Sequence, residues 1–316
     1  MIFEKLPTVL TAEELIDKAF KKASRTGGGK AVRVKATESM ILTASNIISD
    51  NLLNNVRRFP NFDDIPQFYR ELTDILVGID QLKMSLSSLH WASTKVKTLS
   101  RSYIGNLRKG QNPAAIRKQA FGRIASVVRE IDSDLKFLNE ARGKLRKLPA
   151  VADIPTIIVA GYPNVGKSSF VAWISSAKPQ ISTYPFTTKG VLVGHFTHDG
   201  IGYQVIDTPG LLDRPLSERN RIELQAISAL KHLGDVVLFI LDPSETCGYL
   251  LDAQKRLLVD IEKELKIPIV VVTNKGDLRG VDADMSTKTG EGVAEIKAQL
   301  IEILKRPRAR ASSHTS

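Results

Sequence analysis

The stretch GYPNVGKS at residues 161–168 decides the fold of this 316-residue chain. It matches the pattern G-x-x-x-x-G-K-[ST] and lies between a short apolar run, TIIVAG at 156–161, and a helical pattern. The glycines let backbone N–H groups curl around phosphate oxygens, the lysine adds a positive charge, and the serine hydroxyl can bind Mg²⁺. The stretch therefore predicts a phosphate-binding loop. The residues expected to contact phosphate are Gly161, Asn164, Val165, Gly166, Lys167, Ser168 and Ser169.

A second motif, DTPG at 207–210, directly follows the run GYQVID at 202–207, which is typical of a strand. A carboxylate at the carboxyl end of a strand can hold the Mg²⁺ shell, so Asp207 is predicted to be a metal ligand together with Ser168. The backbone N–H of Gly210 is expected to donate to a γ-phosphate.

A third motif, NKGD at 274–277, predicts which base is bound. Asn274 and Asp277 can read the edge of a purine, and Lys275 would cover the plane of the base. A carboxylate that faces N1–H and N2–H₂ selects guanine, because adenine presents the wrong donors. The segment STK, expected one strand further on, suits a backbone contact to the guanine carbonyl and consists of Ser286, Thr287 and Lys288. In this order and spacing the three motifs predict a site for GTP and GDP.

The second half of the chain alternates strand and helix patterns. Two runs, VLVGHFTH at 191–198 and GYQVID at 202–207, flank Asp199-Gly200 and predict a β-hairpin. VVLFIL at 236–241 and PIVVVTN at 268–274 are typical of buried strands. We therefore predict an α/β fold, a doubly wound sheet over residues 151–305 that carries the three motifs. The basic segment 306–316 is predicted to be a disordered tail.

The first half of the chain carries the net charge. Residues 1–150 hold 26 Lys and Arg against 15 Asp and Glu, whereas residues 151–316 hold 19 of each. Residues 95–147 alone hold 14 basic and 4 acidic side chains. This asymmetry favours a polyanionic partner for the first half, with nucleic acid the leading candidate.

Residues 37–148 have the apolar spacing of helices, which predicts an all-α helical-bundle domain over 1–150. One long amphipathic helix is expected from Asn112-Pro113 to Leu148, ended by Pro149. Its polar face is rich in cations, and such a face contacts either a polyanion or only water. The residues predicted to contact RNA are Arg117, Lys118, Arg123, Lys144 and Arg146.

Composition excludes several classes of protein. A single cysteine, Cys247, rules out an internal disulfide framework and most multi-cysteine metal sites. No apolar run approaches the roughly 18 residues of a membrane span, and acidic residues near the N-terminus argue against a signal peptide. We expect a cytoplasmic protein with no membrane partner.

Several longer stretches carry a family resemblance, most specifically LLDRP after the DTPG and SETCGY. The full set is GYPNVGKSSF (161–170), YPFTTKG (184–190), VGH (193–195), VIDTPGLLDRPLSERN (205–220), LDPSETCGY (241–249), RRFP (57–60), FGRI (121–124) and KLRKLPAV (144–151). The chain resembles Obg-related P-loop GTPases, and more closely the nucleolar GTP-binding protein (Nog) family in its short archaeal form. The resemblance implies a GTPase that acts in assembly of the large ribosomal subunit. It also implies that the helical domain binds rRNA of the subunit precursor.

YPFTT fits the switch that senses the γ-phosphate, with Thr187 and Thr188 as the candidate residues. The resemblance favours Thr188 as a ligand of Mg²⁺, because the second threonine of such pairs is the usual ligand in related families. Arg214, in the LLDRP turn, is interpreted as a switch or partner contact.

Leu211 occupies the switch position where many GTPases have a glutamine that orients the attacking water. Leucine has no donor or acceptor, so intrinsic hydrolysis is expected to be slow. Either an activating factor with an arginine or a K⁺ ion beside the phosphates would compensate. Asn164 is a possible K⁺ ligand, and the alternative is an asparagine chosen for turn geometry.

Two other functions remain open on the sequence. The protein could be an RNA-binding placeholder whose shape depends on bound GTP, with negligible hydrolysis. It could also be an Obg-clade GTPase of translation or stress signalling. His195 and Cys247 are interpreted as structural residues.

Overall fold

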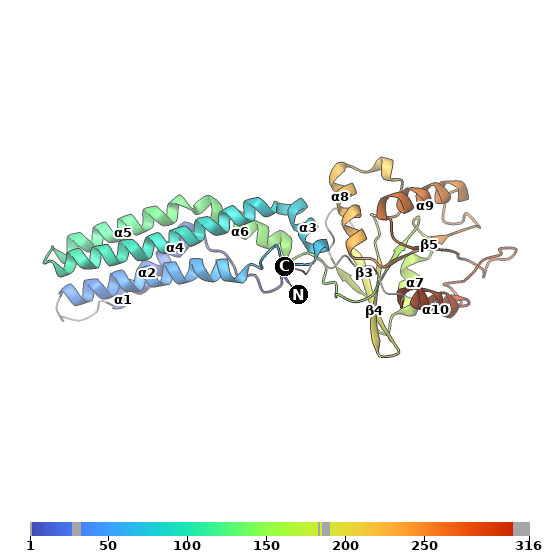
Figure 1. Ribbon diagram of the computed structural model, residues 1–316, viewed down its shortest axis with the longest axis horizontal. Helices are drawn as coiled ribbons and strands as arrows, with labels where there is room; N and C mark the ends of the chain where they lie inside the picture. The colour runs from blue at the N-terminus through green and yellow to red at the C-terminus, as the bar shows by residue number, and fades with distance from the viewer. Residues whose placement is uncertain (1, 27–32, 183, 185–189, 306–316) are drawn as a thin grey trace, which may run out of the picture. The chain divides into compact units, whose positions relative to one another are not determined.

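The computed structural model describes residues 2–26, 33–182, 184 and 190–305 (Figure 1). The chain forms two compact units, one built from residues 1–65 and 76–146 and the other from residues 66–75 and 147–316. The sequence prediction divided the chain at residue 150, so the structure differs in assigning 66–75 to the second unit. The predicted tail 306–316 lies outside the described residues.

The first unit is a bundle of helices that lie side by side in Figure 1. Its core is mainly apolar; Ile41, Ile104, Leu107, Ile116 and Ala120, for example, form one buried cluster. Burial of such side chains contributes about 25 cal/mol per Å² and is the main force that holds a bundle together. The helices of the bundle are α1 (Ala12–Thr26), α2 (Arg33–Arg58), α4 (Ile79–Arg108), α5 (Pro113–Glu130) and α6 (Asp132–Leu145).

The prediction of one long helix after Asn112-Pro113 is wrong at Ile131. The start is as expected, because the Asn112 side chain accepts the N–H of Ala114 and Pro113 occupies the first helical position. At Ile131 the backbone turns to φ −101° and ψ 15°, which separates α5 from α6. Asp132 directly follows, and its Oδ1 accepts the backbone N–H of Ala12 at 2.9 Å, at the start of α1. The break therefore coincides with a contact between helices, which helical periodicity does not reveal.

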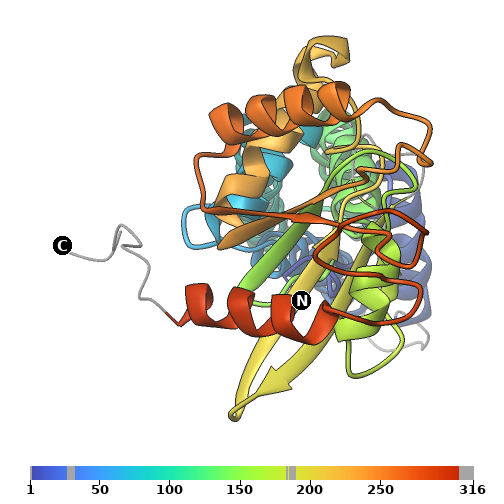
Figure 2. The ribbon, with the colours of Figure 1, turned by 90° about the vertical axis from the view of Figure 1, so that its right-hand side faces the viewer.

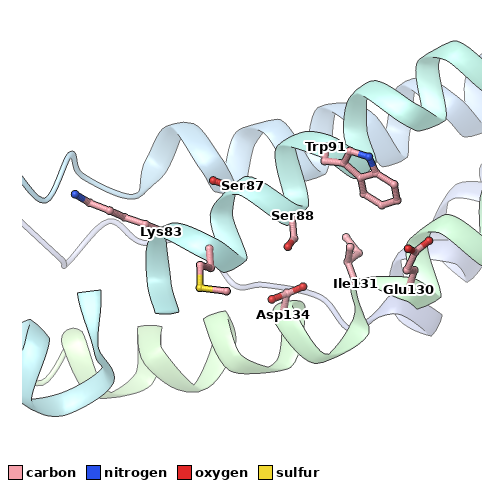
Figure 3. A pocket seen from close by; sticks show the side chains of 8 residues that line it. Lys83, Ser87, Ser88, Trp91, Glu130, Ile131 and Asp134 are labelled. Atoms are coloured by element: carbon pink, nitrogen blue, oxygen red, sulfur yellow. The ribbon is translucent and has the colours of Figure 1, made fainter. Parts of the chain in front are cut away.

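A groove of about 640 Å³ lies beside this break, between α4 and the α5–α6 junction (Figure 3). Trp91 and Met84 line it and are 44% and 64% exposed. The acidic side chains of Glu130 and Asp134 also line it, whereas the Lys83 ammonium hydrogen-bonds a carboxylate of Asp63 at 2.9 Å. The groove is thus a locally acidic part of a basic bundle.

The second unit is built on one sheet with the strand order β2-β3-β4-β1-β5-β6. β1 lies parallel to β4 and β5, and β5 lies parallel to β6, while β3 is antiparallel to β4 and β2. The strands are β1 (Thr156–Ala160), β2 (Gln180–Ser182), β3 (Val191–His198), β4 (Ile201–Asp207), β5 (Val236–Leu241) and β6 (Ile269–Thr273).

The β3–β4 hairpin confirms the predicted pair of strands. Its turn residues Asp199 and Gly200 both have positive φ, 50° and 78°, as such tight hairpin turns require. Two details differ from the prediction. The short edge strand β2 was not predicted, and no strand precedes the STK segment within the described residues 274–292.

Helices cover both faces of the sheet (Figures 1 and 2). α8 (Arg221–Ala229) and α9 (Leu251–Leu265) lie on one face, and α7 (Lys167–Ile174) and α10 (Val293–Leu304) lie on the other. Two short 3₁₀ turns, Leu216–Glu218 and Leu230–His232, flank α8. The predicted fold class, a doubly wound α/β sheet preceded by a helical bundle, is confirmed.

Helix α3 (Gln67–Val77) explains why residues 66–75 belong to the second unit. The hydroxyl of Tyr69 donates to the carbonyl of Pro149 at 2.8 Å and accepts the N–H of Val151 at 3.0 Å. The ring of Phe68 lies 6.3 Å from that of Tyr184. These contacts hold the segment that leads into β1.

Among the described residues, no helix combines the length and apolarity that crossing a bilayer would require.

Candidate nucleotide-binding site

The parallel strands bring the predicted motifs to one edge of the sheet. The loop 161–166 follows β1, DTPG follows β4 and NKGD follows β6. In a doubly wound fold the crevice at the carboxyl ends of the strands is the usual ligand site. The sequence motifs and the sheet topology therefore indicate the same location for the candidate nucleotide-binding site.

The two glycines of the phosphate loop are required by geometry. Gly161 and Gly166 have φ of 132° and 107°, where residues with a Cβ are strained. A Cβ on Gly161 would lie 2.5 Å from the carbonyl oxygen of Ile240, and one on Gly166 would overlap the side-chain amide of Asn274. Gly166 also precedes the first turn of α7, so the N-terminus of that helix faces the loop.

Lys167 and Asn164 occupy contrasting environments in this loop. The Lys167 side chain is buried, and its ammonium donates to the carbonyl oxygens of Gly161 and Tyr162 at 2.8 Å each. The positive charge is therefore held inside the curl of the loop. Asn164 is exposed with φ 63°, a left-handed conformation that asparagine tolerates. Its backbone thus fits the turn interpretation.

Ser168 and Asp207 form the predicted metal pair. The Ser168 hydroxyl donates to Asp207 Oδ2 at 2.5 Å, and Asp207 is fully buried. Its second oxygen, Oδ1, has no hydrogen-bond partner among the described residues. Burial raises the pKa of the Asp207 carboxyl, while the Lys167 ammonium and the Ser168 hydrogen bond act in the opposite direction. A hydroxyl and a carboxylate with a free oxygen are the hard ligands that Mg²⁺ prefers, so this pair fits that ion.

The third predicted metal ligand, Thr188, and the other switch threonine, Thr187, lie outside the described residues. The remaining switch prediction, Leu211, is described. Leu211 is fully buried, and its N–H donates to the carbonyl of Thr208 at 3.0 Å. Its side chain has no donor or acceptor for a water molecule, and the slow hydrolysis expected from this stays a prediction.

Arg219 is a site residue that the sequence analysis missed. Its guanidinium is completely buried and donates to the carbonyl oxygens of Gly210 and Leu211, at 2.5 Å and 2.7 Å. It also pairs with Asp213 at 3.1 Å, and burial lowers the pKa of Arg219. Asp213 in turn accepts the N–H of Gly210 at 2.7 Å. No local pattern marks an arginine nine positions beyond Gly210 as buried, although the family-like stretch 205–220 contains it.

Asn274 joins the phosphate loop to the predicted guanine loop. Its side-chain nitrogen donates to the carbonyl of Val165 at 2.7 Å and to Thr287 Oγ1 at 2.9 Å, and its oxygen accepts the N–H of Thr287 at 2.9 Å. The residue is buried. Its amide is therefore engaged by protein atoms rather than presented to a base, and the structure assigns it a positioning role.

Asp277 has the chemistry predicted for guanine recognition. Its carboxylate accepts the Ser286 hydroxyl at 2.8 Å and lies 3.3 Å from the Lys288 ammonium. The Ser286 hydrogen bond in particular lowers the pKa of Asp277, so the group is ionised. An ionised carboxylate can accept two N–H groups from one edge of a base. The structure brings Ser286, Thr287 and Lys288 together with Asp277 and Asn274, and their contact with guanine stays a prediction.

Trp173 is a second residue that the sequence analysis missed. From α7 its indole N–H donates to the carbonyl of Thr287 at 2.7 Å. Its ring packs against Gly290, where a Cβ would lie 2.6 Å from the ring. The loop that carries Ser286–Lys288 is therefore held from both sides, by Asn274 and by Trp173.

Lys275 is fixed by a buried carboxylate at the end of β5. Its ammonium donates to Asp242 Oδ2 and to Thr246 Oγ1, both at 2.6 Å. Burial by itself would raise the pKa of Asp242, but hydrogen bonds from Lys275, Ser244 and the Cys247 N–H outweigh it and lower the pKa to about 2. The Lys275 side chain of the NKGD motif is thus tied to the loop that follows β5.

Three further residues that the sequence analysis discussed have the following burial and contacts. Cys247 is buried, and burial raises the pKa of its thiol, which argues against a nucleophile. His195 is an exposed residue of β3 opposite Gln204. Arg214 is 46% exposed and pairs with Glu223 at 3.0 Å.

The predicted RNA-contact residues are exposed on the helical unit. Two neighbouring cations, Arg129 and Lys136, are neutralised by Glu13 and Asp132. Within the part of the chain that the structure describes, the five predicted residues form no ion pair. They are Arg117, Lys118, Arg123, Lys144 and Arg146.

Two protein-family models match the chain. The model described as the NOG1 N-terminal helical domain matches residues 3–152, and the model described as Nucleolar GTP-binding protein 1 (NOG1) matches residues 221–277. The first covers the helical unit, and the second covers the chain from the start of α8 through NKGD.

Individual proteins are similar over most of this chain. An uncharacterized protein of Methanocaldococcus jannaschii is 41% identical over 87% of this chain and 81% of its own length. Nucleolar GTP-binding protein 1 of Eremothecium gossypii is 35% identical over 87% of this chain and 45% of its own length. The chain thus spans about half the length of that nucleolar relative. A crystal structure described as nucleolar GTP-binding protein 1 of Plasmodium falciparum shares 38% identity, with a TM-score of 0.45, over 50% of this chain and 90% of that one.

The ion pair between the buried Asp242 and the partly exposed Lys275 makes a testable contribution to stability. Replacing Asp242 by Asn leaves the Lys275 ammonium without its counter-ion, and we expect the free energy of unfolding at neutral pH to fall by about 2 kcal/mol. Because the folded-state pKa is lowered, the stabilisation is complete above the ordinary value of 3.8 and is lost as the pH falls towards about 2. Urea denaturation at a series of pH values measures this difference between wild type and D242N.

Asp282→Asn is the matched control, because Asp282 is exposed and forms no ion pair within the described residues. An equal loss in D282N, or a wild-type advantage over D242N that stays constant down to pH 2, would contradict the interpretation.

Proposed function

The chain belongs to the nucleolar GTP-binding protein 1 family, and on this premise we propose that it is a Mg²⁺-dependent GTPase that acts in assembly of the large ribosomal subunit. In this proposal the α/β unit binds and hydrolyses GTP, and the helical unit binds rRNA in the subunit precursor. The names of the relatives support guanine-nucleotide binding and a connection to the nucleolus.

The observation that best supports nucleotide binding is that the motif segments are hydrogen-bonded to one another. Asn274 bonds both Val165 of the phosphate loop and Thr287 of the guanine loop. Ser168, in the same phosphate loop, bonds Asp207 of DTPG. Motifs that are far apart in sequence therefore form one polar network at the sheet edge, where phosphates, metal and base would be bound side by side.

Each part of this network has a chemical task. Ser168 and Asp207 would hold Mg²⁺, which supplies charge neutralisation for the phosphates when bound. Lys167 would exchange its loop carbonyls for phosphate oxygens, because its ammonium already lies inside the loop. Asp277 would accept N1–H and N2–H₂ of guanine, and adenine lacks this pair of donors.

Activation of the attacking water needs a group beyond Leu211, because that side chain is buried and aliphatic. A positioned donor or an arginine from a partner can contribute about 10³–10⁵ in rate. We propose that an activating factor or K⁺ supplies this contribution, with Asn164 as the possible K⁺ ligand. The exposure of Asn164 leaves its side chain accessible.

The buried, aliphatic side chain of Leu211 also favours a second candidate function. If nothing replaces the missing water-orienting group, the protein would be an RNA-binding placeholder whose bound GTP fixes its shape. Crosslinking to cellular RNA with and without a non-hydrolysable GTP analogue distinguishes the two. A GTPase that times its own departure would stay on precursor RNA with the analogue and leave with GTP, whereas a placeholder would show no difference between the nucleotides.

The RNA part of the proposal is supported by the charge of the helical unit. Residues 95–147 hold 14 basic and 4 acidic side chains, and exposed cations such as Arg117, Lys118 and Arg123 have no counter-ion among the described residues. Cations that are not neutralised by the protein itself are available to phosphates.

Hydrolysis is expected to be slow, to require Mg²⁺ and to depend on Lys167. We expect Lys167→Ala to lower the turnover of GTP by about 100-fold or more, since it removes a charge from the phosphates. Phosphate release from GTP, measured with Mg²⁺ or EDTA, tests this expectation. Lys178→Ala, a change at an exposed lysine outside the motifs, is the control. Turnover in K167A or in EDTA that matches the wild type with Mg²⁺ would contradict the proposal, and equal rates in KCl and NaCl would remove the K⁺ part.

RNA affinity is expected to depend steeply on salt, because it rests on phosphate contacts. Changing Arg117, Lys118 and Arg123 together to Gln should lower the affinity and reduce the slope of log K against log salt by about 2 to 3. Filter binding to precursor rRNA between low and physiological salt measures both. Lys83→Gln, in the acidic groove, is the control and should change neither. A triple variant with an unchanged slope would show that these cations do not contact RNA.

A further inference from the structure

The surroundings of Gly210 differ from those that its proposed role requires. As part of the proposed GTP site, its backbone N–H should donate to the γ-phosphate. In the structure this N–H donates to Asp213 Oδ2 at 2.7 Å instead. An anionic oxygen from the protein therefore occupies the donor that the nucleotide would use.

The other atoms of this loop hold Asp213 in that position. Asp213 Oδ1 accepts a hydrogen bond from Arg219 at 3.1 Å, and Arg219 also donates to the carbonyl of Gly210 at 2.5 Å. Both the N–H and the carbonyl of Gly210 are thus held by one ion pair. We refer to Asp213 and Arg219 with their bonds to Gly210 as the latch.

Burial makes the latch effective. The Arg219 side chain is 0% exposed and that of Asp213 is 16% exposed, so water and salt screen the pair weakly. Glu223 lies 3.8 Å from Arg219 Nη1 and places a second negative charge beside the guanidinium. Charge-assisted hydrogen bonds of this kind are roughly twice as strong as neutral ones.

A γ-phosphate and the Asp213 carboxylate cannot both accept the backbone N–H of Gly210. A backbone N–H is a single donor, and the two acceptors are both anions that would repel each other at that distance. Asp213 is also close enough to the metal pair that its negative charge contributes to the raised pKa of Asp207. GTP must therefore displace Asp213 to reach Gly210, whereas GDP has no γ-phosphate and leaves the latch closed.

We propose that Asp213 is a specificity-determining residue that competes with the γ-phosphate for the N–H of Gly210 and so lowers the affinity for GTP relative to GDP. This inference rests on the proposed function, because it presupposes a guanine-nucleotide site. When GTP displaces Asp213, Arg219 loses its hydrogen bond to that carboxylate. The presence of the γ-phosphate thereby changes the contacts of the 210–219 loop. The latch thus converts the presence of one phosphate group into a rearrangement of the loop.

The experiment compares Asp213→Asn with wild type in the full chain. Asparagine keeps the shape but loses the charge, so it is a weaker acceptor for Gly210 and a poor partner for Arg219. We expect the affinity for a non-hydrolysable GTP analogue, measured by calorimetry with Mg²⁺, to rise about tenfold. The affinity for GDP should stay within about twofold. Asp213→Ala, which removes the acceptor, should shift the ratio in the same direction, and thermal unfolding checks that both variants are folded.

Glu218→Gln is the matched control, since it removes a negative charge from an exposed position of the same loop. It should leave both affinities unchanged. An analogue affinity that does not rise in D213N, that falls together with the GDP affinity, or that rises equally in E218Q would overturn the proposal while leaving the nucleotide site intact. A wild-type protein that binds neither nucleotide would overturn the proposed function and this inference with it.

Discussion

The hydrogen bonds of one side-chain amide hold together the sheet edge where we propose that the nucleotide binds. Asn274 contacts the phosphate loop through Val165 and the guanine loop through both the backbone and the hydroxyl of Thr287. Because the residue is buried, these bonds are made without competition from water. Asn274 therefore links the proposed phosphate subsite directly to the proposed base subsite. Trp173 and Lys275 secure the neighbouring segments around it.

The two halves of the chain differ in how their charges are distributed. The α/β half is neutral overall, so its electrostatics are local: Lys167 in the loop, a buried Asp207, and the Asp242–Lys275 pair. The helical half carries the net positive charge on exposed faces and has an apolar core. Buried charges need specific partners, whereas exposed charges interact with any nearby polyanion. This difference is the physical basis for proposing catalysis in one half and RNA binding in the other.

Much of the fold could be predicted from the sequence because its signals are local. The phosphate loop requires glycines at Gly161 and Gly166, and the β3–β4 hairpin requires residues that tolerate positive φ in its turn. These constraints act within a few residues of the chain. The motifs then indicated the edge of the sheet where the candidate site lies.

The features that the sequence did not reveal depend on contacts between distant segments. The break at Ile131 accompanies a bond from Ala12 to Asp132, and α3 belongs to the second unit through contacts of Tyr69 with residues 149–151. Arg219 and Trp173 act on the site from positions that no motif marks, because only the folded chain brings them to it. Side chains of this kind look ordinary in sequence, since their burial is set by tertiary packing.

The central claim is that the polar network around Asn274 and Asp277 forms a site for a guanine nucleotide. Calorimetric titration of the purified chain with GDP and with ADP, both with Mg²⁺, tests it most directly. The ionised Asp277 should make GDP bind at least about 10³-fold more tightly than ADP. Equal affinities for the two nucleotides would contradict the claim.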